Sequence, residues 1–110
     1  MPSSEKFLKS FGFIVGSQFD DYVLDEASAT HVTIKRYQEY EYHIELLFYN
    51  IGNGTWESLF NVLRKNINEE HIVKGARNPY RCIIDYPSYG DVRGDNNEIK
   101  ISLTGHAYRD

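Results

Sequence analysis

Three residues have side chains whose types and spacing could do chemistry: His43, Glu45 and Asp85. His43 and Glu45 are two residues apart, so on an extended strand both side chains point to the same face. There they could supply two metal ligands or an acid–base pair. Asp85 lies between two apolar residues, which can perturb a carboxylate. We take all three as weak catalytic candidates, and favour the alternative of surface groups, with Asp85 a strand-end charge paired with an arginine.

The rest of the sequence argues against catalysis. A catalytic metal usually needs three protein ligands, and this spacing supplies two. The sequence has no pattern typical of serine hydrolases, zinc proteases, phosphate-binding loops, dinucleotide-binding folds or calcium loops. Cys82 is the only cysteine and lies in an apolar run, so we expect a buried side chain and no disulfide. We therefore expect no metal and no cofactor, and favour a non-enzymatic role.

Charge and hydropathy exclude two classes of partner. The 110 residues have a formal net charge of −4, and a nucleic-acid-binding protein needs a clustered basic surface. The nearest approach is a thin cluster of Lys74, Arg77 and Arg81. No stretch approaches the ~18 apolar residues of a membrane span, and the N-terminus lacks an apolar signal region. We expect a cytoplasmic protein that binds neither nucleic acid nor membranes.

The clearest predicted element is a helix over about residues 55–67. Thr55 can cap its N-terminus. Its apolar residues recur at helical spacing and form a stripe that faces the core: Trp56, Leu59, Phe60, Leu63 and Ile67. A short N-terminal helix over about residues 4–11 is predicted from a second stripe, which consists of Phe7, Leu8 and Phe11.

Residues 31–37 and 41–49 are typical of two antiparallel strands that a turn at 38–40 connects. This register places Ile34 opposite Ile44 and keeps each face chemically uniform. Other segments complete the prediction: strand pieces at 13–15 and 19–24, a polar connection at 68–79, strands at 80–86 and 98–105, and a long loop at 87–97. We predict a single α+β domain over residues 1–110, with one antiparallel sheet of four to six strands and both helices packed on it.

The two faces of the second hairpin strand differ in the predicted sheet. One face is apolar throughout, and consists of Tyr40, Tyr42, Ile44, Leu46 and Phe48. The other face is polar from Glu41 to Glu45 and apolar from Leu47 to Tyr49. Since a strand buried on one face alternates throughout, something must cover Leu47 and Tyr49. The N-terminal helix, the chain ends and a second molecule are the alternatives.

These patterns favour a small acidic protein-interaction module, either a homodimer or an inhibitor or immunity-type protein that binds a basic partner. The predicted binding residues are Tyr37, Glu39, Tyr40, Glu41, Leu47, Tyr49 and Tyr89. The alternative is a small-molecule-binding domain or small enzyme. It requires a pocket between sheet and helix on which at least two of His43, Glu45 and Asp85 converge.

Overall fold

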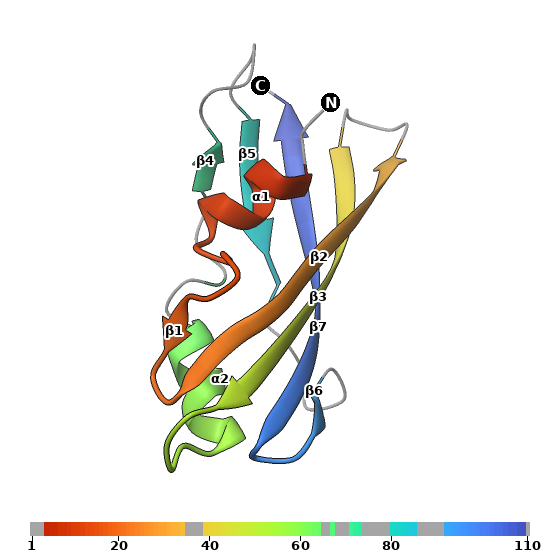
Figure 1. Cartoon of the computed structure of the whole chain (residues 1–110). Coiled ribbons are helices and arrows are strands. Elements are labelled where there is room, and N and C mark those ends of the chain that lie inside the picture. Colours follow the sequence, from red (N-terminus) through yellow and green to blue (C-terminus); the bar gives the residue numbers. More distant parts are fainter. Residues whose placement is uncertain are drawn as a thin grey trace.

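The computed structural model of the chain describes residues 4–34, 39–64, 67, 71–73, 80–85 and 92–109. In chain order the elements are α1 (Ser4–Ser10), β1 (Gln18–Phe19), β2 (Tyr22–Ile34), β3 (Glu39–Asn50), α2 (Trp56–Arg64), β4 (His71–Val73), β5 (Tyr80–Ile84), β6 (Val92–Gly94) and β7 (Glu98–Arg109). Three long strands, β2, β3 and β7, run through most of the length of the molecule (Figure 1).

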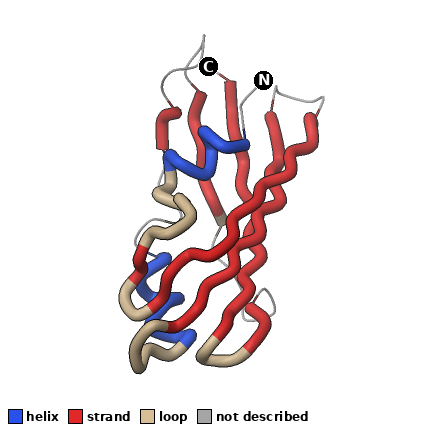
Figure 2. The backbone as a smooth tube through the Cα atoms, in the orientation of Figure 1, coloured by secondary structure: helices blue, strands red, loops and turns tan. Residues whose placement is uncertain are grey.

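All strands pair antiparallel in one sheet of order β1-β2-β3-β7-β5-β4, and β6, outside this order, pairs with the first part of β7. The sheet curls into a half-barrel, with α1 and α2 on its inner side (Figure 2). The predicted α+β class is therefore confirmed. The expected strand piece at 13–15 does not form, since these residues lie in the connection between α1 and β1. Seven strands nevertheless form in the described ranges, more than the four to six predicted, because β4 and β6 lie in segments predicted to be loops. Their three residues each are too few to show alternation.

The main helix, α2, begins where the sequence predicts. The Thr55 and Ser58 side chains cap its first turn reciprocally: Ser58 N–H donates to Thr55 Oγ1 at 3.4 Å, and Thr55 N–H donates to Ser58 Oγ at 3.2 Å. Leu59, Leu63 and, beyond the helix, Ile67 are buried. Three residues of the predicted stripe therefore belong to the core, while Trp56 packs against the core partly buried and Phe60 is only partly buried.

The short helix α1 docks on the inner face through aromatic contacts. The Phe7 ring stacks on Tyr42 with centroids 4.0 Å apart, and both side chains are fully buried. Gly105 of β7 makes room for this contact, because a Cβ there would lie 2.6 Å from Phe7 Cζ. The absence of a side chain at position 105 therefore allows α1 to pack this close to β7.

The alternation predicted for β3 is confirmed. Its inner residues are buried, and they are Tyr40, Tyr42, Ile44, Leu46 and Phe48. They form the core with residues from both helices and from β7. The intervening residues of β3 are partly or fully exposed. The inner face of β3 is therefore structural.

The predicted hairpin register was wrong. Ala29, not Ile34, pairs with Ile44, and Ile34 pairs with Glu39. The reason is length, since this register pairs β2 with β3 from Tyr22 to Ile34. The predicted register would leave the first residues of β2 without partners, because β3 ends at Asn50. The longer backbone ladder outweighs the better side-chain match.

Candidate functional site

The outer face of the sheet is the side away from both helices. On β3 it consists of Glu41, His43, Glu45, Leu47 and Tyr49, and their partners on β7 are His106, Thr104, Ser102, Lys100 and Glu98. The helix α1 was one of three predicted covers for Leu47 and Tyr49, but it packs on the inner face instead (Figure 1). Leu47 remains half-buried and Tyr49 is 41% exposed. The change in polarity along β3 therefore lies on a surface that no described helix covers.

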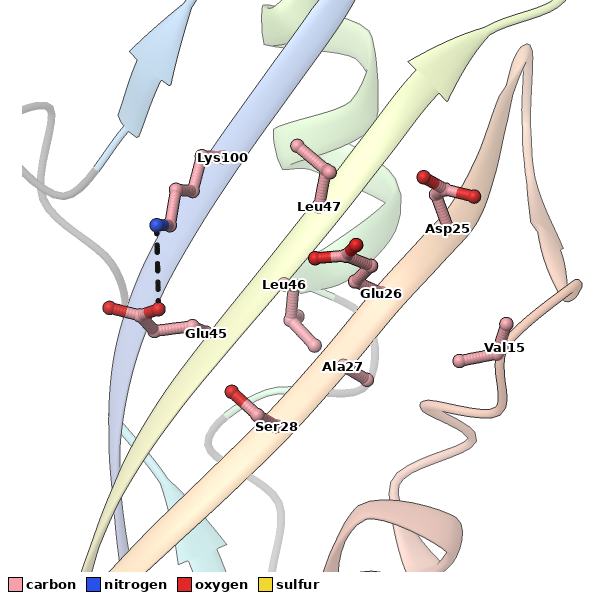
Figure 3. A pocket seen from close by; sticks show the side chains of 9 residues that line it. All are labelled: Val15, Asp25, Glu26, Ala27, Ser28, Glu45, Leu46, Leu47 and Lys100. Atoms are coloured by element: carbon pink, nitrogen blue, oxygen red, sulfur yellow. Dashed lines mark ion pairs between the residues drawn. The ribbon is translucent and has the colours of Figure 1, made fainter.

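A groove of about 430 Å³ lies at this change in polarity, and we call it the outer groove. It is lined by Val15, Asp25, Glu26, Ala27, Ser28, Glu45, Leu46, Leu47 and Lys100. Figure 3 shows β2, β3 and β7 side by side beneath it, with Val15 beyond the edge of β2. Glu45 and Leu47, the two sides of the predicted polarity boundary, are both part of it. The sequence pattern therefore located the groove, although it did not predict a concave surface.

A β-bulge builds the acidic side of the outer groove. Leu24 pairs with Phe48 and Glu26 with Leu47, so Asp25 is an extra residue in β2. In a regular strand two successive side chains point to opposite faces. Here Asp25 and Glu26 are both exposed, and both line the groove. The bulge therefore places two adjacent carboxylates together.

The opposite side of the groove holds an ion pair. Lys100 Nζ lies 3.4 Å from Glu45 Oε2, and both side chains are more than half exposed. Water screens such a pair, so its contribution to stability is small. Its effect on the groove is to neutralise Glu45, while the negative charge of Asp25 and Glu26 remains.

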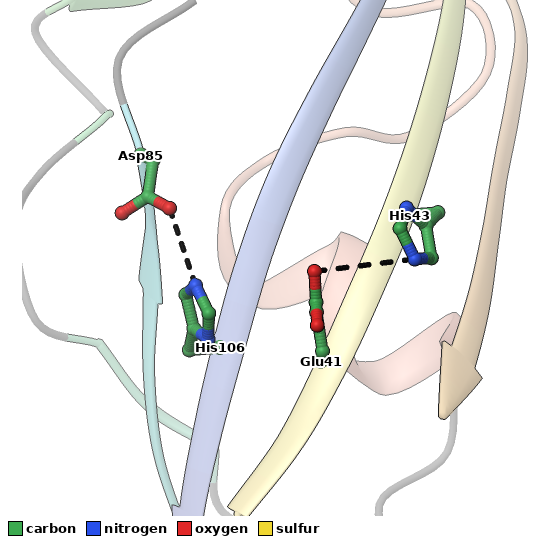
Figure 4. A network of polar contacts seen from close by, with 4 residues as sticks. All are labelled: Glu41, His43, Asp85 and His106. Carbon is green, nitrogen blue, oxygen red and sulfur yellow. Dashed lines mark hydrogen bonds and ion pairs between the residues drawn. The ribbon is translucent and has the colours of Figure 1, made fainter. Parts of the chain in front are cut away.

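Further along the outer face, two carboxylates and two imidazoles alternate across β5, β7 and β3. We call these four residues, Asp85, His106, Glu41 and His43, the polar row (Figure 4). His106 Nε2 lies 3.2 Å from Asp85 Oδ2, and His43 Nε2 lies 4.0 Å from Glu41 Oε1. The register places Glu41 directly opposite His106. Each imidazole therefore has a carboxylate oxygen within 4.0 Å of its Nε2 atom.

The three catalytic candidates do not meet. His43 and Glu45 line a small depression of about 200 Å³ with Ser102 and Thr104. Asp85 lies at the end of β5 beside His106, with a histidine rather than the expected arginine as its partner. Among the residues that the structure describes, no three His, Cys, Asp or Glu side chains are placed to hold a metal ion. The sequence could not place His106, since only the β5–β7 pairing brings it to Asp85.

Three of the predicted binding residues lie on the outer face, and these are Glu41, Leu47 and Tyr49. Tyr40 lies on the inner face and is only 8% exposed, so it belongs to the core. Glu39 is the first residue of β3. Tyr37 and Tyr89 lie outside the described residues.

Cys82, predicted to be a buried residue, is fully buried on the inner face of β5. Burial raises the pKa of its thiol to about 12, from an ordinary value of 9.0. Because the thiolate is the reactive form, Cys82 is a packing residue and takes no part in a site.

One end of the molecule gathers negative charge around Tyr22, whose hydroxyl donates to the carbonyl oxygen of Asn96 at 2.8 Å. Burial raises the pKa of Tyr22, and the charges of Asp21, Glu57 and Asp95 raise it further. The three carboxylates come from the β1–β2 turn, α2 and the β6–β7 turn. Tyr22 is the first residue of β2, and the bulge at Asp25 lies three residues further along the same strand.

Comparison of the chain with protein-family models, with curated proteins and with solved structures finds no match. In the ranges that the structure describes, neither helix has the length and apolar character of a membrane span. The chemistry of the outer face therefore has to carry the functional interpretation.

Proposed function

We propose that this chain is a small acidic protein-interaction module that binds its partner through the outer face of the sheet. The observation that carries the proposal is the outer groove, which lies where β3 changes from polar to apolar. Both helices pack on the other face. The outer face is thus the place where a partner can bury apolar surface without displacing part of the fold.

The outer face combines the two kinds of residue that protein interfaces use. Leu47 offers an apolar contact surface and Tyr49, which is 41% exposed, offers an aromatic one. Asp25 and Glu26 add charge beside them, and charge sets the rate of encounter and the choice of partner more than the affinity. This arrangement supports an anchor of apolar side chains with an acidic rim.

The acidic balance favours a basic partner. The chain has a formal net charge of −4, and three carboxylates outside the groove surround Tyr22, the first residue of β2. An inhibitor or immunity-type protein is the concrete form that we favour, because such proteins act by covering a basic surface with complementary charge. A second copy of this chain is the other form, in which the outer faces of two molecules meet.

Site-specific photocrosslinking tests the proposal. A photoreactive amino acid replaces Ser28, in the groove, or Asn61, on the exposed side of α2. After irradiation in extracts of the native source, we expect one protein to be crosslinked from position 28 and not from position 61. Light scattering of the purified chain separates the two forms, since a homodimer doubles the molar mass. A monomer that crosslinks nothing from position 28 contradicts the proposal.

The depression lined by His43 and Glu45 favours a second candidate, a small-molecule-binding domain or small enzyme. Two of the three predicted polar groups converge there, but on the outer face rather than between sheet and helix. A screen of metabolites by thermal shift tests it. A compound that stabilises the protein, and no longer does so after His43→Ala, favours this candidate over the interaction module.

A further inference from the structure

The carboxylates of Asp25 and Glu26 give one side of the outer groove an uncompensated negative charge. Both are exposed and adjacent because of the bulge. Among the described residues that line the groove, the ion pair is the one between Lys100 and Glu45, on the opposite side. The groove thus combines three carboxylates with one ammonium group, and its Asp25 side attracts a further cation.

The floor between these charges is apolar. Leu47 is half-buried in the floor, and Val15, 59% exposed, forms a wall beyond the edge of β2. Lys100 already shows how a cation lies here: it is the ladder partner of Leu47, and its ammonium group reaches the Glu45 carboxylate (Figure 3). A long side chain with an aliphatic stem and a charged head suits both the floor and the acidic rim.

We infer that the outer groove is a subsite for an arginine side chain of a partner protein, with the stem on Leu47 and the guanidinium between Asp25 and Glu26. The inference rests on the proposed function, since the arginine belongs to the partner. A planar guanidinium has five donors and can bind two neighbouring carboxylates at once, whereas a lysine ammonium is a single point charge. A volume of about 430 Å³ is enough for one long side chain and its flanking backbone, because ligand pockets of roughly 300–1,000 Å³ hold whole small molecules.

The test is a titration of the isotope-labelled chain, followed by NMR, with the peptide acetyl-Gly-Ser-Arg-Ser-Gly-amide. A peptide with citrulline in place of arginine has the same shape without the charge. We expect the arginine peptide to shift the amide signals of Val15, Asp25, Glu26 and Leu47, and the citrulline peptide to bind roughly tenfold more weakly. Equal binding of the two peptides overturns the inference.

Matched variants test the position of the charge. Asp25→Asn with Glu26→Gln removes two charges from the groove, and Glu5→Gln with Asp20→Asn removes two from exposed positions outside it. We expect the first pair to weaken binding about fivefold and the second to leave it unchanged. If both pairs of substitutions weakened peptide binding equally, binding would depend only on the net charge of the protein, and the inference would be overturned.

Lys100→Gln provides a test of opposite sign. It frees Glu45 from its ion pair, so we expect the arginine peptide to bind roughly twofold more tightly. Weaker binding contradicts the proposed placement. All five positions are exposed, so these variants should fold.

The crosslinking experiment and the peptide titration test the proposed function and the arginine subsite separately. If position 28 crosslinks a partner but the arginine peptide does not bind, the interaction module stands and the arginine subsite is wrong. If the peptide binds in the groove but position 28 crosslinks nothing, the subsite is real as a cation site and the proposed function is wrong.

Discussion

The two faces of β3 show how differently one strand can use the same residue types. Leu46 and Leu47 are neighbours in the chain, yet Leu46 is fully buried in the core and Leu47 lies half-buried in the floor of the outer groove. Tyr42 stacks on Phe7 beneath α1, whereas Tyr49 is 41% exposed on the other side. The face, and not the residue type, decides whether a side chain stabilises the fold or is available to a partner.

The inner face leaves no room for polar chemistry. Among the described residues no polar or charged side chain is buried there, and the nucleophile that it does hold, Cys82, is kept neutral by burial. The outer face carries the groove and the polar row. Five predictions test this contrast, from the largest expected effect to the smallest.

The largest contrast is in thiol reactivity. Cys82 should react with Ellman's reagent at pH 8 at least about a thousandfold more slowly than a cysteine introduced by Ser28→Cys, because Cys82 needs unfolding to be exposed. The reaction is followed by absorbance, with and without urea. Rapid modification of Cys82 in the native protein would contradict its placement in the core.

The same thiol has a consequence for stability at high pH. Because its folded pKa of about 12 lies above the ordinary 9.0, the folded state prefers the neutral thiol. This contribution is fully present below pH 9 and is lost as the pH rises towards 12. Cys82→Ser unfolding curves measured at pH 8 and pH 10.5 should show a smaller decline in stability than the parent chain.

The adjacent leucines give the next contrast. We expect Leu46→Ala to lower the free energy of unfolding by about 3 kcal/mol, since it leaves a cavity in the core. Leu47→Ala should cost less than about 1 kcal/mol, because Leu47 is already partly in water. Urea unfolding followed by tryptophan fluorescence measures both. Equal losses would mean that the two faces are packed alike.

Gly105 and Ser102 test the same faces on β7. Gly105→Val should destabilise the protein by roughly 2 kcal/mol, because its side chain would meet the Phe7 ring. Ser102→Val, on the exposed outer face, should stay within about 0.5 kcal/mol of the parent. Thermal unfolding by circular dichroism compares them. An unchanged melting temperature for Gly105→Val would contradict the docking of α1.

The smallest effect belongs to the groove itself. Lys100→Gln breaks the ion pair with Glu45, but we expect it to change the free energy of unfolding by less than about 0.5 kcal/mol, since both groups are largely in water. The variant should nevertheless bind the arginine peptide roughly twofold more tightly. A loss of more than 1 kcal/mol would assign this pair to stability rather than to recognition.

The amino-acid sequence alone determined the features that depend on local spacing. The apolar stripe and Thr55 placed α2, and the period of two along residues 40–49 separated the faces of β3. It also identified Glu45 and Leu47 as a boundary, which is where the outer groove lies. Such signals are reliable because a helix or strand sets the direction of each side chain from its position in the chain.

Only the tertiary structure decided the features that depend on pairing. Ala27 and Ala29, opposite Leu46 and Ile44, are too small to mark a core strand in the sequence, so the register was mispredicted. The bulge that turns both Asp25 and Glu26 towards the outer groove depends on how β2 pairs with β3, and the contact of His106 with Asp85 depends on how β5 pairs with β7. These features follow from the pairing of strands that are distant in the chain, and no local pattern in the sequence records that pairing.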